Sequence, residues 1–222
     1  MCGRYTSLGS PEELMRRFGV TITQNLRPRW NVAPSQKATV IALDGLHTEA
    51  MTVVWGLQAV GGKKAMLINA RMETANEKST FSGAFLHSRC IVVASGWYEW
   101  SGPKMPWYIQ LRNGGVMAIA GLLLRRGADL RFVILTSAAD RKFEKIHHRQ
   151  PLVLATGDEE RWLYGAPDRA ASLCKIAPAS WFKWHRVSID VGKVGVDYPE
   201  LVAPLESNEL SPAKLDQGDL FS

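Results

Sequence analysis

Strand-forming segments separated by glycine-containing turns run through the middle of this chain, and they limit its fold more than any other feature. Residues 37–43 and 49–55 are predicted to pair as a hairpin around Asp44-Gly45, a dipeptide that favours a tight reversal. Further strands are predicted around Asn113-Gly114-Gly115 and Gly127-Ala128-Asp129, over residues 106–111, 116–124 and 130–136. Because short turns join strands that run in opposite directions, the middle of the chain is predicted to be mostly antiparallel sheet.

Short helices are predicted beside these strands. Ser10 is suited to the N-cap, Pro11 to the first turn and Glu13 to a capping box, so a helix is expected to begin here and to end at Gly19. Other helices are predicted over residues 78–87, 140–146, 156–163 and 168–174, and a central strand over residues 89–94. A chain of 222 residues is long enough for one well-cored domain, although two small ones also fit.

The composition describes a globular chain with a modest excess of positive charge. Hydrophobic residues make up 46% and charged residues 22%, and no apolar run is long enough to span a membrane. The polar start does not look like a signal peptide, and an odd count of three cysteines indicates free thiols in a reducing cytoplasm. Metal-ligand spacings such as C-x-x-C are absent, so neither a metal nor a cofactor is expected. The net charge of +6 is a weak indication of a polyanionic partner.

The sequence Met1-Cys2-Gly3-Arg4 is the strongest chemical signal. A small side chain at position 2 permits aminopeptidase removal of Met1, after which Cys2 carries a thiol and a free amine on adjacent carbons. In unperturbed peptides these groups have pKa values of roughly 8.5 and 7.7–8.0, so both are partly deprotonated near neutrality. Such an aminothiol traps aldehydes, first as a Schiff base and then as a thiazolidine. Arg4 adds a permanent cation suited to phosphate. The simpler alternative is a buried thiol near a frayed terminus.

Two other segments carry candidate acid–base groups. Glu99 lies within Gly96-Trp97-Tyr98-Glu99-Trp100, where aromatic neighbours are expected to raise its pKa toward that of a general acid. The alternative is an exposed glutamate on an edge strand. His147 and His148 follow a predicted helix and precede Pro151, and we interpret them as the rim of a site rather than as a solvated helix end.

Three segments combine cations, aromatic residues and polar groups in a way that suits a nucleic acid strand. Residues 27–34 form a basic, proline-rich loop, and residues 181–188 alternate aromatic and basic side chains, as single-strand binding grooves do. Residues 67–74 are predicted to deliver Asn69 and Arg71 to a site. For residues 27–34 the alternative is a surface loop that packs Trp30 into the core. For residues 181–188 it is a strand at the edge of the core whose cations reach the solvent. For residues 67–74 it is a surface ion pair between Arg71 and Glu73.

From about residue 205 the composition becomes polar, which predicts a disordered tail over residues 205–222 after a domain over residues 1–204. The tail ends in Gln217-Gly218-Asp219-Leu220-Phe221-Ser222, which resembles the pentapeptide that binds the bacterial sliding clamp. Gln217, Leu220 and Phe221 are the expected contact residues. The alternative is a tail that folds back and packs Phe221 onto the domain.

Several motifs in register are similar to those of the SRAP family, the SOS-response-associated abasic-site processing proteins. The resemblance extends from Cys2 to about Val202 and rests on Met1-Cys2-Gly3-Arg4, Asn31-Val32-Ala33-Pro34, Trp55-Gly56, Ile68-Asn69-Ala70-Arg71-x-Glu73-Thr74, Gly96-Trp97-Tyr98-Glu99-Trp100 and Ile146-His147-x-Arg149-x-Pro151. It implies a single α+β domain with a strongly curved, mostly antiparallel sheet core flanked by short helices. It also implies a covalent cross-link to abasic sites in single-stranded DNA, formed as a thiazolidine that shields the site from cleavage during replication.

The same resemblance implies a role for each matching residue. Cys2 matches the nucleophile, Glu99 the acid and base that opens the deoxyribose ring, His147 the histidine that handles protons, and Asn69 the residue that orients the sugar. The residues expected to bind DNA are Arg4, Asn31, Pro34, Trp55, Gly56, Arg71, Trp97 and His185. Two departures are His148, where the family often has Asp, and the loop after Gly56, which lacks the usual Pro and Trp.

Two functions of other classes remain open at this point. Glutamine amidotransferases also begin Met-Cys-Gly, so an N-terminal-nucleophile cysteine amidohydrolase or peptidase is the main alternative. In such an enzyme the α-amine serves only as a base. The other is a single-strand binding module with an incidental Cys2. For an abasic-site processing protein, lyase-like and self-processing activities are further expectations beside the adduct, and the expected setting is a monomer in the cytoplasm, associated with the nucleoid.

Overall fold

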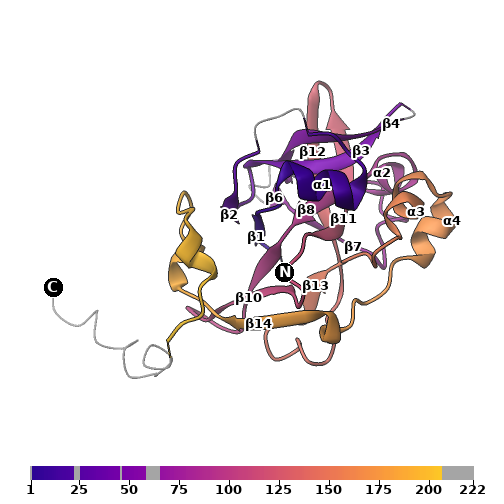
Figure 1. Ribbon diagram of the computed structural model, residues 1–222. Helices are drawn as coiled ribbons and strands as arrows, with labels where there is room; N and C mark the ends of the chain where they lie inside the picture. Colours follow the sequence, from indigo (N-terminus) through magenta and orange to yellow (C-terminus); the bar gives the residue numbers. More distant parts are fainter. Residues whose placement is uncertain (1, 23–25, 46, 59–65, 207–222) are drawn as a thin grey trace.

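The computed structural model describes residues 2–22, 26–45, 47–58 and 66–206, which form two main sheets flanked by short helices (Figure 1). One sheet has five antiparallel strands in the order β14-β10-β9-β1-β2. Their bounds are Phe182–Arg186, Pro106–Leu111, Gly96–Trp100, Arg4–Ser7 and Arg29–Val32. The strand β2 falls within residues 27–34, for which the sequence predicts a loop.

The other sheet closes on itself. Its strands are β3 (Lys37–Asp44), β4 (His47–Trp55), β7 (Asn69–Arg71), β8 (Arg89–Ala94), β11 (Met117–Arg126), β12 (Asp129–Ala138) and β13 (Arg149–Pro151). Because β12 pairs with both β4 and β11, the strands β11-β8-β3-β4-β12 form a ring, and β7 and β13 extend it along the far half of β12. A small third sheet joins β5 (Leu57–Gln58) to β6 (Met66–Leu67). The prediction of a curved, mostly antiparallel α+β domain is confirmed.

One continuous stretch of chain connects the two main sheets. The strand β8 has six buried residues and lies between β3 and β11 in the ring, as predicted for a central strand. It leads through Ser95 into β9 of the five-stranded sheet, and Ser95 donates its backbone N–H to Thr6 and accepts a bond from Leu8 at its hydroxyl. The start of the chain is therefore fastened beside the strand that carries Glu99.

The α-helices share one hydrophobic cluster with strands of the ring, and their termini are set by local chemistry. The helix α1 (Pro11–Phe18) begins where Ser10 accepts a bond from the Glu13 N–H, and it ends at Gly19 with φ 67°. The other helices are α2 (Ser82–His87), α3 (Glu159–Tyr164) and α4 (Pro167–Ser172), and an ion pair between Arg17 and Glu159 joins α1 to α3 (Figure 1). The buried guanidinium of Arg89 donates to carbonyls at the ends of α2 and α3, which satisfies backbone groups that helix termini leave open.

Three predicted helices differ from the structure. Residues 141–146 form successive turns, because the Asp140 carboxylate accepts the N–H groups of both Lys142 and Ala179 and holds the chain away from a helical path. The helix predicted from residue 156 begins only at Glu159, since Gly157 has φ 92° and Glu159 accepts its N–H. The helix predicted over residues 78–87 is likewise reduced to its second half, after a run of turns.

Short 3-10 helices end the described chain: η1 (Ala179–Trp181), η2 (Ile189–Gly192) and η3 (Pro199–Val202). The helices η2 and η3 lie beyond β2, on the side of the molecule opposite α3 and α4 (Figure 1). Within the described parts of the chain, no helix has the length and apolar character needed to cross a membrane. Most of the predicted tail, with Gln217, Leu220 and Phe221, lies outside the described residues, so clamp binding stays a prediction.

Candidate active site

The start of the chain meets three other segments at one buried point. Asn69, the first residue of β7, donates its side-chain amide to the carbonyl oxygen of Cys2 at 2.9 Å. The Cys2 side chain is fully buried, and its thiol points to the Arg4 carbonyl at 3.9 Å. The Oδ1 atom of Asn69 is also buried and has no hydrogen-bond partner among the described residues, so it can accept a bond from a ligand.

Glu99 provides a carboxyl group with an unusual pKa. It lies on β9, between β1 and β10, and only 3% of the residue is exposed. Burial disfavours the charged form and raises the pKa of Glu99 to about 7. The alternative of an exposed glutamate on an edge strand is therefore wrong, and the expected aromatic, desolvated setting is confirmed. Near neutral pH the carboxyl can both donate and accept a proton.

His147 lies next to this carboxyl. Its Nδ1 atom is 3.9 Å from Oε1 of Glu99 and accepts the backbone N–H of Arg149 at 3.0 Å. Nδ1 also lies 3.2 Å from the Arg149 carbonyl oxygen, so Arg149 offers a backbone partner to either tautomer of the neutral ring. Burial, and then nearby positive charge, lowers the pKa of His147 to about 4. The ring of His148 stacks on it with centroids 4.3 Å apart. His147 is thus a neutral base at physiological pH.

Residues outside the predicted site hold this histidine in place. The Arg149 guanidinium makes a bidentate contact with Glu73, at 2.7 and 2.9 Å, and donates to the Thr136 carbonyl at 2.6 Å. Glu73 therefore pairs with Arg149, and the alternative of a surface ion pair between Arg71 and Glu73 is wrong. Arg149 belongs to the quoted motif Ile146-His147-x-Arg149, but nothing local in the sequence indicates its partner 76 residues away.

The thiol of Cys2 differs from a thiol exposed to water. Burial, together with the neighbouring Glu99 charge, raises the pKa of Cys2 well above its usual range. With Met1 in the chain, the buried thiol keeps its proton near neutrality, and the partial deprotonation expected of Cys2 after Met1 removal stays a prediction. Any reaction of Cys2 as a nucleophile consequently needs a nearby proton acceptor, and the Glu99 carboxylate is near enough to act electrostatically on it.

Three of the residues expected to bind DNA lie in the core instead. The indole of Trp55 is fully buried and donates to the Ile68 carbonyl at 2.9 Å, and Gly56 beside it is also buried. Trp97 is 1% exposed and packs edge-on against Phe143 and Phe182. Neither indole can stack on a base in this conformation, and a DNA-binding role for these three residues stays a prediction.

Asn31 has a well-defined internal role. Its side-chain amide donates to the carbonyls of Val191, Lys193 and Val196, while Asp197 accepts the Asn31 N–H at 3.0 Å. These bonds fasten residues 187–203 over the edge strand β2. Asp197 also accepts from the Trp30 N–H and forms an ion pair with Arg29. Sequence reasoning missed Asp197, because its partners lie more than 160 residues away.

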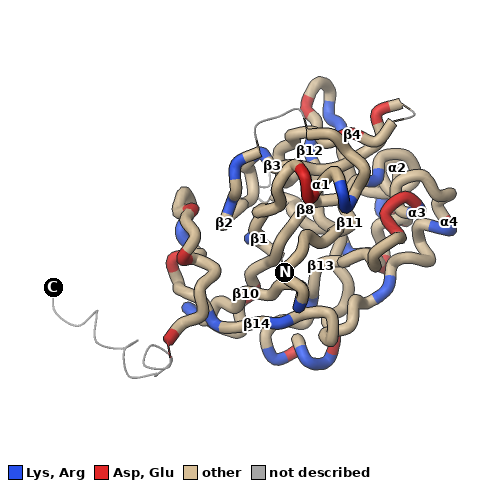
Figure 2. Tube along the Cα trace, viewed as in Figure 1, with Lys and Arg blue, Asp and Glu red and all other residues tan. Residues whose placement is uncertain are grey.

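The remaining residues expected to bind DNA are more accessible. Arg71 is exposed, and its guanidinium has no hydrogen bond or ion pair within the described chain, while Pro34 is half-buried. Arg4 is also half-buried, and it donates to the carbonyls of Gly3 and Gly192. The His185 ring shares a hydrogen bond with the Val202 carbonyl at 2.8 Å. Figure 2 shows Lys and Arg positions on several elements of the chain trace, including β14 and the loop before β13.

Comparisons with known proteins agree on one family. A family model described as "SOS response associated peptidase (SRAP)" matches residues 1–194. The "Abasic site processing protein YedK" of Escherichia coli is 34% identical over 92% of this chain and 100% of its own length. The "Abasic site processing protein HMCES" of Gallus gallus is 30% identical over 81% of this chain and 67% of its own length.

Two solved structures share the fold. A protein from Bacteroides thetaiotaomicron has a TM-score of 0.80 at 22% identity, over 92% of this chain and 100% of that one. A phage-related protein from Bordetella bronchiseptica has a TM-score of 0.72 at 26% identity, over 84% of this chain and 94% of that one. The similarity thus includes both the sequence that carries Cys2 and the sheets that surround it.

Proposed function

The chain belongs to the SOS response associated peptidase (SRAP) family, and from that premise we propose that it processes abasic sites in single-stranded DNA through Cys2. Two relatives at 30% identity or more carry the name abasic site processing protein. An abasic site exposes an aldehyde when its deoxyribose ring opens, and a 1,2-aminothiol captures aldehydes. The proposed product is a covalent thiazolidine that joins Cys2 to the DNA and shields the site from strand cleavage.

The observation that carries this proposal is the placement of Glu99 and His147. A carboxyl group with a pKa of about 7 lies 3.9 Å from a neutral imidazole, close to the buried Cys2. Ring opening requires a proton to leave the C1′ hydroxyl and another to reach the ring oxygen. A half-protonated carboxyl is suited to both transfers, and general acid–base catalysis of this kind is typically worth about 10²–10⁴-fold in rate.

The following steps form two bonds to one carbon. After Met1 is removed, the Cys2 amine attacks C1′ of the aldehyde, and loss of water, assisted by His147, leaves an imine. The Cys2 sulfur then bonds to the same carbon, and the thiol proton moves to the imine nitrogen, with Glu99 or His147 as the carrier. The thiazolidine is neutral and lacks the iminium that promotes β-elimination. Capture of the imine therefore competes with lyase-type cleavage.

Two features support DNA as the partner. Arg71 is exposed and has its guanidinium available, and Arg4 lies two residues from the nucleophile, so both suit phosphate groups. The unsatisfied oxygen of Asn69 lies beside Cys2, where it can accept a hydrogen bond from a sugar hydroxyl. These features match the roles that the family resemblance implies for Asn69, Arg4 and Arg71.

Intact mass spectrometry with abasic single-stranded DNA tests the proposal. The expected result is a mass increase equal to the DNA minus one water, on a chain that has lost Met1. Undamaged DNA is the substrate control, and Cys174→Ala is the matched protein control, since it removes a different, partly exposed cysteine. Glutaminase activity without any DNA adduct would favour the amidohydrolase alternative and contradict the proposal.

A further inference from the structure

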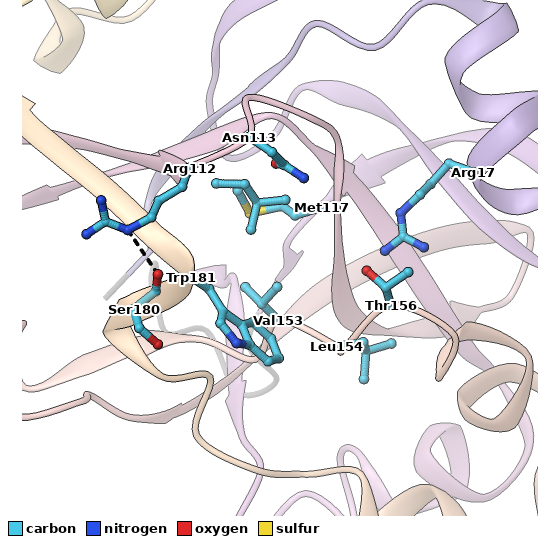
Figure 3. Close-up of a pocket in the computed structure, with 10 residues that line it drawn as sticks. Arg17, Arg112, Asn113, Met117, Val153, Leu154, Thr156, Ser180 and Trp181 are labelled. Atoms are coloured by element: carbon cyan, nitrogen blue, oxygen red, sulfur yellow. Dashed lines mark hydrogen bonds between the residues drawn. The ribbon is translucent and has the colours of Figure 1, made fainter.

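A pocket lies between the end of the β10 strand, helix α1 and the short helix η1, and the mechanism above does not use it. Its volume is about 340 Å³, within the roughly 300–1,000 Å³ range of small-molecule sites. Figure 3 shows Met117, Val153 and Leu154 along its floor, with Arg112 and Trp181 on one side and Arg17 and Thr156 on the other. The pocket therefore combines an apolar floor with two guanidinium groups at its sides.

Trp181 is available for stacking. It is 36% exposed, whereas Trp55, Trp97 and Trp162 are buried almost completely. Its carbonyl accepts the backbone N–H of Arg112 at 2.9 Å, which holds the indole and the arginine next to each other. Within the described chain the indole N–H has no hydrogen-bond partner. An indole held half-exposed in a pocket, rather than in the core, can receive the flat face of a ring.

Arg112 supplies the charge that a ligand would meet. Its Nε atom donates to the Ser180 carbonyl at 3.0 Å, which fixes the direction of the guanidinium. The two terminal nitrogens have no partner among the residues that the structure describes. On the opposite side, Arg17 forms an ion pair with Glu159, so the unpaired positive charge belongs to Arg112. An anionic group is the complementary partner for that side of the pocket.

We propose that this pocket binds one nucleoside phosphate unit, with its base on Trp181 above the apolar floor and its phosphate at Arg112. The unit is either a free nucleotide or a nucleotide of the strand that is processed at Cys2, and only the second source rests on the proposed function. Base–aromatic stacking beside arginine is the usual way in which proteins hold single-stranded nucleic acid.

The pocket is separate from the Cys2 site. Trp107 of β10 pairs with Glu99 on β9, and Arg112 follows five residues later along the same direction. At about 3.4 Å per residue, Arg112 lies roughly 17 Å from Trp107, the partner of Glu99, measured along the β10 direction. The aromatic cluster of Trp97, Phe143 and Phe182 occupies the interval on this face of the sheet. A nucleotide in the pocket would therefore neighbour the abasic site without overlapping it.

The test follows the indole N–H signal of Trp181 by NMR in the full chain, assigned from its loss in Trp181→Phe. Thymidine monophosphate is expected to shift this signal, and Arg112→Gln is expected to weaken binding roughly fivefold or more. Arg125→Gln is the matched control, because it removes an exposed arginine near the other end of β11. A Trp181 signal that neither the nucleotide nor an undamaged oligothymidine moves would overturn the proposal, as would equal effects of the two arginine variants.

A competition experiment then distinguishes the two sources. If a long oligothymidine displaces thymidine monophosphate from Trp181, the pocket takes a nucleotide of the strand, and Arg112→Gln should also weaken binding of that oligonucleotide. If the mononucleotide stays bound, the source is a free nucleotide. Adduct formation is measured separately with an abasic oligonucleotide that reaches Cys2 but is too short to reach the pocket at Trp181. Failure of that reaction would contradict the proposed function and leave the result for the pocket unaffected.

Discussion

Nδ1 of His147 lies 3.9 Å from Oε1 of Glu99, but burial drives both groups toward their neutral forms rather than toward an ion pair. The pKa of Glu99 is raised to about 7 and that of His147 is lowered to about 4. Between these values the carboxyl carries a proton while the imidazole is an unprotonated base. An acid and a base are therefore both available over the same range of pH, next to Cys2.

Substitution of Cys2 tests its two functional groups separately. Cys2→Ala keeps the α-amine and removes the sulfur, so we expect no adduct that survives heating in denaturant. Cys2→Ser should leave at most a Schiff base that borohydride traps. Denaturing gels with abasic single-stranded DNA measure both results. A heat-stable adduct formed by Cys2→Ala would show that the sulfur does not bond to the DNA.

The pKa of Glu99 predicts how its contribution varies with pH. The Glu99 carboxyl is protonated below pH about 7 and loses its proton above it. Its contribution as a general acid should therefore decline as pH rises through about 7. The ratio of the adduct-formation rates of wild type and Glu99→Gln, at saturating DNA, should fall over that interval. Because both proteins share the Cys2 amine, its own titration cancels in the ratio. A ratio that stays constant from pH 5 to 9 would make Glu99 a structural residue.

The Arg149–Glu73 pair should influence both stability and the position of His147. Glu73→Gln leaves the Arg149 guanidinium, whose side chain is only 10% exposed, without its charged partner. We expect a loss of about 1–3 kcal/mol in the free energy of unfolding and slower adduct formation. Arg149→Lys should behave similarly, because lysine cannot make the bidentate contact. A double-mutant cycle in urea measures the coupling, and strictly additive effects would mean that the pair does not act as a unit.

Asn31 offers a direct comparison between a structural role and a DNA-binding role. Its amide is used by three carbonyls of residues 191–196, so Asn31→Ala should lower the free energy of unfolding by about 1–3 kcal/mol. Asp197→Asn should have an effect of the same sign, since it weakens the other half of this attachment. Affinity for undamaged single strands, measured well below the melting temperature, should change little. If Asn31→Ala instead lost much of its affinity for single-stranded DNA without any loss of stability, Asn31 would have the DNA-binding role.

Salt should weaken the binding of undamaged single strands, because cations that contact phosphates displace counterions. Arg71 is exposed and unpaired within the described chain, so Arg71→Gln should reduce the slope of log K against log salt by about 0.7. Arg161→Gln is a suitable control, since that exposed arginine already pairs with Asp158. An unchanged slope in Arg71→Gln would remove Arg71 from the DNA path.

Local sequence predicted the elements whose geometry depends on near neighbours. The hairpin of β3 and β4 around Asp44-Gly45, the strand β10 and the two ends of α1 all follow from turn, capping and propensity rules that act over a few residues. The same rules were wrong for residues 141–146. There the Asp140 carboxylate reaches Ala179, a partner that no local window contains.

The sequence by itself determined the family and the mostly antiparallel character of the sheets, and it supplied the residues that we propose as reactive. Only the tertiary structure decided which side chains are buried together. Closure of the ring through β12 places Trp55 in the core, and the pairing of β9 with β1 and β10 encloses Glu99. The pKa values of Cys2, Glu99 and His147 follow from that enclosure, because desolvation depends on every neighbour in space and not on those in sequence.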